Sequence, residues 1–238
     1  VGTALYVAAD TYRSVTPSTS EFGTLVSAFD LVQPAAPVAR PSLWFAGSDH
    51  AVAATDVFLF VATSRANNYW QSDLHALDIT APDGTIRDHA TIPTAGRVAD
   101  KFKLNWADGV LAAVSEVAPI NGTTRWLTRL ETFTLPHPAS AGPLGVVKLG
   151  ELELGHGEQL FGTRFDGPRL YVVTYLRVDP LWVVDLSDPA RPRVAGELEV
   201  PGWSTYLHPM GDRLVTMGID DVNGFRASVS LFDVHDVS

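Results

Sequence analysis

The sequence predicts an all-β protein whose strands form a β-propeller of about five four-stranded blade units. Three observations lead to this prediction: a recurring strand motif, the even spacing of its copies, and turn residues between short apolar runs. In each copy a central residue stands between two apolar residues: Phe29-Asp30-Leu31, Leu77-Asp78-Ile79, Phe133-Thr134-Leu135, Val184-Asp185-Leu186 and Phe232-Asp233-Val234. The central residues are 48, 56, 51 and 48 positions apart, and strand-rich repeats of roughly 40–50 residues are typical of propeller blades.

The clearest unit lies between residues 158 and 202. Its first strand is predicted at Gln159–Phe165 and its second at Arg169–Arg177, with a glycine-containing turn between them. The third strand, Leu181–Leu186, is a dense apolar run, and the fourth, Arg193–Val200, alternates apolar and polar residues. Continuous apolar inner strands and a half-polar outer strand suit stacked sheets, because stacking buries the inner strands on both faces.

The other units follow the same plan. Second strands are predicted at Leu5–Asp10, Val57–Thr63, Val110–Val117 and Leu214–Ile219, and fourth strands at Val38–Phe45, Thr85–Ile92 and Val146–Leu154. The chain opens in a second strand and closes in a third strand at Ser228–Val234, which predicts eighteen strands in units of three, four, four, four and three. We therefore expect a single domain that is incomplete at both ends and part of a larger ring, with units at about residues 1–47, 48–96, 97–157, 158–202 and 203–238.

Two polar segments are predicted to be loops, and no segment shows the sustained 3.6-residue apolar period of a helix. Thr11–Gly23 is rich in Ser and Thr and is expected to be mobile. Ala66–Asp73 carries Tyr69 and Trp70. Aromatic side chains on exposed loops can stack on sugars or anchor a protein partner, so these two are candidate binding residues.

Composition narrows the partner classes. The chain has 17 basic and 27 acidic residues and a net charge of −10, which disfavours nucleic acid and anionic membranes. It has no cysteine, which excludes disulfides, zinc–thiolate sites and thiol nucleophiles. No apolar run approaches the roughly 18 residues that would span a bilayer, so no transmembrane segment is predicted in this chain.

No motif for phosphate binding, a nucleophile elbow or a zinc helix is present, so no catalytic residue is predicted. His50 and His208 lie near inner strands, where ring symmetry could bring them toward a common axis. His208 is kept as a candidate binding residue, although histidines in such positions are more often structural or solvated.

The acidic residues allow two interpretations. Asp220, Asp221 and Asn223 form an oxygen-rich stretch that could bind calcium, but the spacing is incomplete and a plain hairpin turn fits as well. No other cofactor is expected. The aspartate at the centre of the repeated motif is predicted to be structural, because its carboxylate can accept N–H groups of the turn that follows.

Longer motifs in residues 158–238 resemble a known family. They are Arg169-Leu-Tyr-Val-Val-Thr-Tyr, Val178-Asp-Pro-Leu-Trp-Val-Val-Asp-Leu-Ser-Asp-Pro, Gly196-Glu-Leu-Glu-Val-Pro-Gly-Trp-Ser-Thr-Tyr-Leu-His-Pro and Ser230-Leu-Phe-Asp-Val. The pattern is similar to that of secreted bacterial and archaeal proteins with a β-propeller domain distantly related to WD-40 repeats. Thr134 departs from it, because the other units have Asp at that position.

The resemblance implies a propeller, export from the cytoplasm and a secreted or cell-envelope location, within a domain longer than this chain. It supplies no catalytic residues. The expected function is a non-catalytic extracytoplasmic propeller that binds a protein or polysaccharide through its loops. A hydrolase or lyase with a site at the mouth of the axial channel is the alternative, and the remainder of the polypeptide is a further expected partner.

Overall fold

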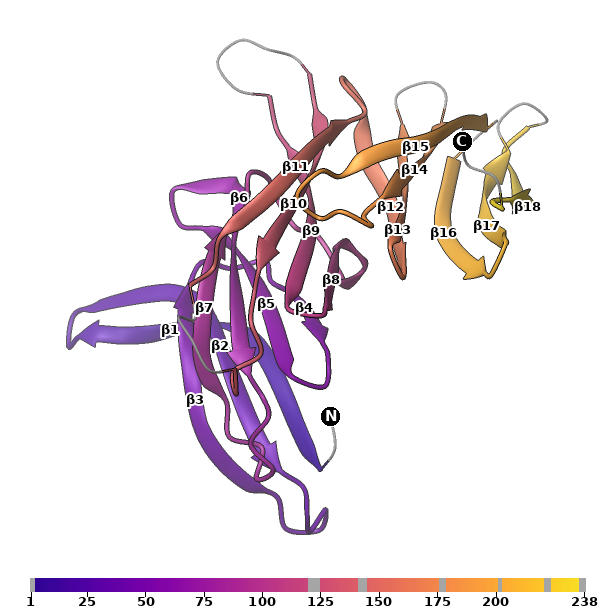
Figure 1. The fold of residues 1–238 in the computed structure, drawn as a ribbon. Coiled ribbons are helices and arrows are strands. Elements are labelled where there is room, and N and C mark those ends of the chain that lie inside the picture. Colours follow the sequence, from indigo (N-terminus) through magenta and orange to yellow (C-terminus); the bar gives the residue numbers. More distant parts are fainter. Residues whose placement is uncertain are drawn as a thin grey trace. The chain divides into compact units, whose positions relative to one another are not determined.

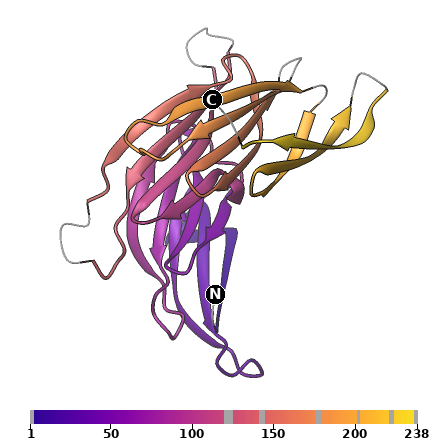
Figure 2. The same cartoon turned by 45° about the vertical axis from the view of Figure 1, so that its right-hand side comes forward.

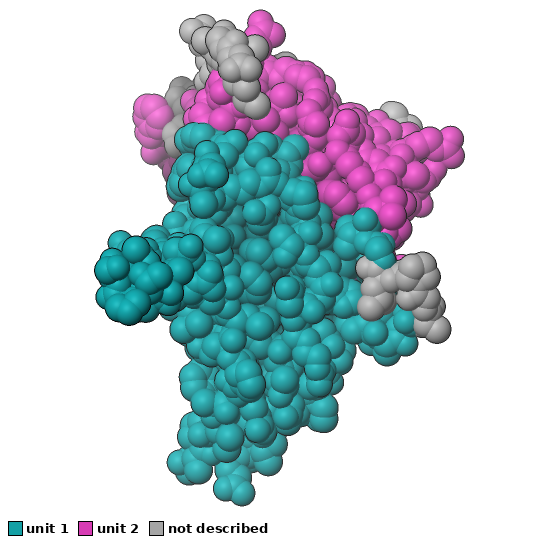
Figure 3. Space-filling model, turned by 90° about the vertical axis from the view of Figure 1, so that its left-hand side faces the viewer, with its two compact units in different colours: residues 1–101, 135–146 teal, residues 102–134, 147–238 magenta. Residues whose placement is uncertain are grey.

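The computed structural model describes residues 3–119, 125–140, 145–175, 179–200, 203–220 and 224–235. The chain divides into two compact units (Figure 3): unit 1 comprises residues 1–101 and 135–146, and unit 2 comprises residues 102–134 and 147–238. The described residues form five antiparallel sheets of three, four, four, four and three strands, which confirms the predicted all-β class and strand count. The helical content of this described part is one 3₁₀ turn, Lys101–Lys103.

Unit 1 contains the first two sheets, in which strands that follow each other in the chain are neighbours (Figure 1). The first sheet has the order β1-β2-β3 and the second the order β4-β5-β6-β7. The strands are β1 (Ala4–Thr16), β2 (Thr19–Asp30), β3 (Val38–Ala46), β4 (Ala51–Ala54), β5 (Phe58–Arg65), β6 (Asn68–Asp78) and β7 (Arg87–Pro93).

Unit 2 contains three sheets of the same meander topology, ordered β8 to β11, β12 to β15 and β16 to β18. Figure 2 shows the last of them, in yellow, as a separate layer. The strands are β8 (Leu104–Ala107), β9 (Val110–Val117), β10 (Leu127–Thr134), β11 (Lys148–Leu154), β12 (Gln159–Asp166), β13 (Arg169–Tyr175), β14 (Asp179–Asp185), β15 (Arg193–Val200), β16 (Trp203–Met210), β17 (Arg213–Asp220) and β18 (Arg226–Asp233).

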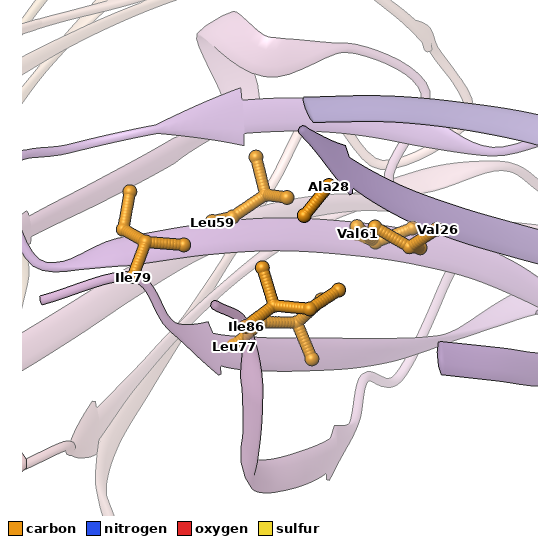
Figure 4. Close-up of a cluster of buried hydrophobic side chains, with 7 residues drawn as sticks. All are labelled: Val26, Ala28, Leu59, Val61, Leu77, Ile79 and Ile86. Carbon is orange, nitrogen blue, oxygen red and sulfur yellow. The ribbon is translucent and has the colours of Figure 1, made fainter. Parts of the chain in front are cut away.

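The sheets of unit 1 pack face to face through an apolar cluster. Side chains of β2 meet side chains of β5 and β6, and Figure 4 shows them gathered between the strands. The cluster consists of Val26, Ala28, Leu59, Val61, Leu77, Ile79 and Ile86, all at most 5% exposed. Every residue of β5 except the last is buried, because this inner strand contacts neighbours on both faces.

Unit 2 has two such clusters, one between each pair of successive sheets. Ala112 and Val114 of β9 pack with Leu170 and Val172 of β13 in the first. Tyr171 and Val173, on the opposite face of β13, pack with residues of β16 and β17 in the second. Within each unit, successive sheets therefore bury apolar faces against each other, as stacked propeller blades do.

The repeated aspartate has the predicted structural role. In four of the five copies its Oδ1 accepts the backbone N–H of the residue two positions later, at 2.8–3.0 Å. Each of these carboxylates also forms an ion pair with an arginine of the same sheet: Asp30 with Arg40, Asp78 with Arg87, Asp185 with Arg193 and Asp233 with Arg213. The carboxylate thus holds the end of the third strand and the start of the next connection.

Thr134 replaces this arrangement in the third sheet with a weaker one. The backbone N–H of Val147 donates to Thr134 Oγ1 at 2.8 Å, and the N–H of Thr134 donates to the Val147 carbonyl at 2.8 Å. The hydroxyl of Thr134 carries no charge, so it cannot form the ion pair with arginine that the aspartate forms in the other four sheets.

The prediction of a mobile loop at Thr11–Gly23 is wrong. β1 and β2 continue through it as a paired ribbon, visible beside the label β1 in Figure 1. Cross-strand pairs explain the order: the rings of Tyr12 and Phe22 lie 4.8 Å apart, and Arg13 forms an ion pair with Glu21 at 2.9 Å. Such pairs stabilise a ribbon even where the composition is typical of a loop.

A buried histidine lies in β6. His75 is 6% exposed, and its ring stacks on Phe45 of β3 with centroids 3.9 Å apart. Its Nδ1 lies 3.0 Å from Thr91 Oγ1 and its Nε2 lies 3.3 Å from Thr63 Oγ1. Burial lowers the pKa of His75 below its usual 6.5, so the ring is neutral in the folded protein at pH 7.

We predict that this histidine makes unit 1 sensitive to mild acid. As the pH falls below about 6.5, the unfolded chain binds a proton that the folded chain resists, so the free energy of unfolding decreases. Urea unfolding at pH 7.5 and pH 5.5 measures the loss. His75→Gln can still form hydrogen bonds but does not titrate, and it should show a smaller decrease; an unchanged pH dependence would contradict the assignment.

Candidate functional site

Five polar side chains of unit 1 meet where its two sheets are joined, and we call them the Asp49 cluster. They come from separate elements: β1, the link between β3 and β4, the start of β6, and the segment after β7. The members are Asp10, Asp49, His50, Tyr69 and Arg97.

The link between β3 and β4 follows a tight path that positions two of these residues. Gly47 has a φ of 96° and Asp49 a φ of 57°. Thr24 Oγ1 donates to the Gly47 carbonyl at 3.0 Å, and Ser64 Oγ donates to the Ser48 carbonyl at 2.7 Å. A non-glycine residue with positive φ is strained, and these hydrogen bonds to the two residues before Asp49 hold the link in place.

Asp49 binds two side chains from the second sheet and its outgoing connection. Tyr69 Oη donates to Asp49 Oδ2 at 2.8 Å, and Arg97 Nη2 donates to the same oxygen. The Arg97 guanidinium also lies 5.2 Å from the centre of the Tyr69 ring. The hydrogen bond from Tyr69, with the one from Arg97, holds the pKa of Asp49 below its usual 3.8, and the same bond raises the pKa of Tyr69.

Asp10 connects the first sheet to this link. Its carboxylate accepts from Thr24 Oγ1 at 2.8 Å and from the backbone N–H of Asp49 at 3.0 Å, and it lies 2.8 Å from His50 Nδ1. Partial burial alone would raise the pKa of Asp10, but the three hydrogen bonds outweigh it and lower the pKa below 3.8. Both aspartates are therefore ionised at neutral pH.

Tyr69 and Trp70 lie in a bulge of β6, so the predicted loop over Ala66–Asp73 is confirmed only for the turn at 66–67 and is wrong from Asn68 onward. β6 begins at Asn68, which pairs with Arg65, and the next pair joins Ser72 to Ser64, so the residues between stand outside the ladder. A bulge redirects side chains that would otherwise follow the alternation of the strand. Here it turns two neighbouring aromatic residues outward.

The bulge is held at both ends. The N–H of Trp70 donates to Asn68 Oδ1 at 3.2 Å. Gln71 Oε1 accepts from Arg65 at 2.8 Å, and Gln71 Nε2 donates to the Ala95 carbonyl at 3.3 Å. Tyr69 is 50% and Trp70 40% exposed, and their rings meet edge to face, 5.3 Å apart at 85°. We call this pair of half-exposed rings the aromatic platform.

His208, the other candidate binding residue, is not part of this cluster. It lies on β16 in unit 2, exposed, with its ring parallel to that of Tyr206 at 6.2 Å. His50 and His208 belong to different units and have different neighbours. The predicted binding role of His208 stays a prediction.

The candidate calcium site is only partly described. Asp220 is the last residue of β17 and pairs with Arg226 of β18, while Asp221 and Asn223 lie outside the described residues. Within the part of the chain that the structure describes, no group of three or more His, Asp or Glu side chains could hold a metal ion. Calcium binding at this hairpin stays a prediction.

Sequence reasoning missed Asp10, Asp49 and Arg97, the residues that hold the aromatic platform. They are 39 and 48 positions apart in the chain, and no motif connects them. The one local signal is Gly47-Ser48-Asp49, a run of turn-forming residues between an outer strand and the next inner strand. Such a run predicts a turn but not what its aspartate binds.

The repeat, the five meander sheets and their face-to-face packing define a β-propeller. The chain belongs to the beta propeller domain family, whose model matches residues 2–238. This agrees with the resemblance noted from the sequence.

Two relatives carry the name "Uncharacterized protein". One, from Methanocaldococcus jannaschii, is 45% identical over 93 residues, which are 39% of this chain and 14% of the relative. The other, from Archaeoglobus fulgidus, is 39% identical over 84 residues, which are 35% of this chain and 13% of the relative. The matched segments therefore span far less than two thirds of either relative.

Among solved structures, the crystal structure of BamB from Moraxella catarrhalis is similar, with a TM-score of 0.52 and 14% sequence identity. The similarity covers 94% of this chain and 58% of that one. At this identity the similarity supports the fold and nothing further.

Proposed function

We propose that this propeller is a non-catalytic scaffold that binds a protein partner through the aromatic platform of unit 1. The observation that carries the proposal is the pair of half-exposed rings, Tyr69 and Trp70. The hydroxyl of Tyr69 is bound to Asp49, and the backbone N–H of Trp70 is bound to Asn68. Aromatic side chains that are already immobilised lose little entropy on binding, which favours affinity.

The residue types favour a protein over a polysaccharide. Trp, Tyr and Arg are the three residues most enriched among those that dominate protein–protein binding energy, and Trp70, Tyr69 and Arg97 supply one of each. The ring of Tyr69 is near the guanidinium of Arg97 and its hydroxyl is bound to Asp49. Tyr69 thus offers a sugar less free hydrogen-bonding capacity than an unpaired tyrosine would.

The Asp49 cluster does not suit acid–base catalysis, the alternative function. A catalytic acid or base works best with a pKa near the working pH. Here the pKa values of Asp10 and Asp49 are lowered and that of Tyr69 is raised, so each pKa lies further from pH 7 than its usual value does. The hydrogen bonds that cause these shifts support a structural role.

We infer that the protein works outside the cytoplasm, in the secreted or cell-envelope setting that the family resemblance implies. In the described residues no helix is long and apolar enough to cross a bilayer. Protease treatment of intact cells tests the location: digestion of the protein is expected, and full protection until the cells are lysed would contradict it.

Photo-crosslinking in living cells tests the proposed function. A benzoylphenylalanine at position 70 of the full-length protein is expected to form a discrete product that contains a second polypeptide. The matched control is position 161, because Phe161 lies in unit 2 and is 37% exposed, close to the 40% of Trp70. A product that contains glycan instead of protein, or equal products at both positions, would contradict the proposal.

We further propose that these sheets are blades of a larger ring, within one propeller domain. The outer face of the last sheet carries an apolar patch: five side chains there are 42–69% exposed, and three of them, Tyr206, Met217 and Val229, are paired directly across β16, β17 and β18. They are Tyr206, Met210, Met217, Val229 and Leu231. In the first sheet Leu5 and Val7 are 46% and 41% exposed, while the alternate residues Tyr6 and Ala8 pack on the core. A further apolar sheet would cover such faces.

One substitution tests the larger ring. Leu231→Ala should change stability little in the 238-residue chain, because Leu231 is 65% exposed there. In a longer polypeptide that supplies the covering sheet, the same change should cost about 2–5 kcal/mol, as buried leucines do. An equally small cost in both would contradict the proposal.

A further inference from the structure

The strand register of four sheets, one in unit 1 and three in unit 2, reveals a position where the sheet β8 to β11 differs from the others. The central residue of the repeated motif always pairs with the same position of the second strand. The pairs are Asp78 with Phe58, Thr134 with Val110, Asp185 with Arg169 and Asp233 with Arg213. This register aligns the sheets residue by residue without reference to their sequences.

Two residues further along the second strand, the aligned positions hold Phe60, Ala112, Tyr171 and Val215. Phe60 and Tyr171 are buried, at 1% and 0% exposure. Tyr171 packs into the cluster toward the following sheet, and Ala112 belongs to the cluster between its own sheet and the following one. The third sheet therefore presents a methyl group where the fourth presents an aromatic ring.

An open pocket of about 640 Å³ lies at this point, between the sheet β8 to β11 and the sheet β12 to β15. Ala112 and its cross-strand partner Thr132 form part of its wall, with Leu186 on the facing sheet. Thr132 Oγ1 donates to the Pro189 carbonyl at 2.5 Å, which joins the two sheets beside the pocket. The volume is in the range of small-molecule sites.

Two polar side chains of the pocket, Asn105 and Asp108, differ from Thr132 in having no hydrogen-bond partner among the described residues. Asn105 of β8 and Asp108 of the following turn line it. Among the described residues neither side chain forms a hydrogen bond or an ion pair. The carboxylate and the amide lie beside a wall that includes the apolar residues Val110, Ala112 and Leu186. This arrangement favours a ligand with a hydrogen-bond donor at one end and an apolar body at the other.

We propose that this pocket binds a small organic cation with an aromatic body. The ring would occupy the volume that Tyr171 fills at the equivalent position of the next sheet, and the ammonium group would meet Asp108 and Asn105. This site is in unit 2 and does not depend on the partner surface of unit 1. The residues that line the pocket determine both ends of the ligand. The small side chain of Ala112 leaves room for an aromatic body, and the carboxylate of Asp108 favours a positive charge.

Calorimetry with 2-phenylethylamine and the full chain tests the site, with 3-phenylpropionate as a control of similar shape and opposite charge. The amine is expected to bind and the acid to bind at least about tenfold more weakly. Asp108→Asn should weaken amine binding about tenfold, because it removes the charge while asparagine tolerates the positive φ of 51°.

Two further variants complete the test. Asp56 precedes Phe58 as Asp108 precedes Val110, so Asp56→Asn is a matched control that should leave binding unchanged. Ala112→Phe should fill the pocket and abolish binding; Ala107→Leu, at the exposed edge of the pocket, serves if that variant fails to fold. The proposal is overturned if the amine does not bind at millimolar concentration, if the acid binds equally, or if neither Asp108→Asn nor the filling variant weakens binding.

Discussion

Replacing Gly47 by alanine is expected to lower the free energy of unfolding by about 3–5 kcal/mol. Gly47 has a φ of 96°, a conformation that residues with a Cβ rarely adopt. A Cβ built there would lie 1.9 Å from the Ser64 carbonyl oxygen, which is a backbone atom and cannot rotate away. The link that carries Asp49 and His50 would have to move, so thermal unfolding should shift and Tyr69 should lose its bond to Asp49.

Gly157→Ala is the matched control. Gly157 has a φ of 98°, but a Cβ there would meet no atom within 4 Å. It therefore measures the cost of backbone strain alone, expected at about 1–2 kcal/mol. Equal losses for both variants would show that the close approach to Ser64 contributes nothing to the stability of the link.

The second large effect is expected from Leu170→Ala, which should cost about 2–5 kcal/mol in the stability of unit 2. Leu170 is fully buried between two sheets, where it packs with Ala112, Val114 and Leu130. Truncation leaves a cavity that strands held by ladders on both sides cannot close. Urea unfolding followed by fluorescence measures the loss.

Leu231→Ala is the appropriate comparison, because it removes the same atoms from an exposed position of the same unit. Its cost in the 238-residue chain should be below about 1 kcal/mol. If both leucine variants lost the same stability, the packing of successive sheets through their apolar faces would be the wrong description.

The sequence predicted the fold well because its signals repeat. Four aspartates of the motif end a third strand and accept the backbone N–H two positions later, so four copies support the same interpretation. Strand ends were harder to place. The ribbon at Thr11–Gly23 depends on pairs such as Arg13 with Glu21, which become evident only when the register is known.

The candidate site was predicted in part. Tyr69 and Trp70 were found because exposed aromatic residues in a polar segment are unusual. Their partners were not predicted, because Asp49 binds Tyr69 and Arg97 from segments that are far apart in the sequence. The pocket at Ala112 could not be predicted either, because a small residue in an apolar strand shows no void until the register aligns it with Tyr171.

Nitrogen-15 relaxation of the Trp70 indole N–H measures whether the aromatic platform is rigid before a partner binds. The edge-to-face contact of the Trp70 ring with Tyr69, on a backbone held by Asn68, predicts an order parameter near the value of about 0.85 found for rigid backbone. A value below about 0.6, typical of a flexible group, would contradict this rigidity.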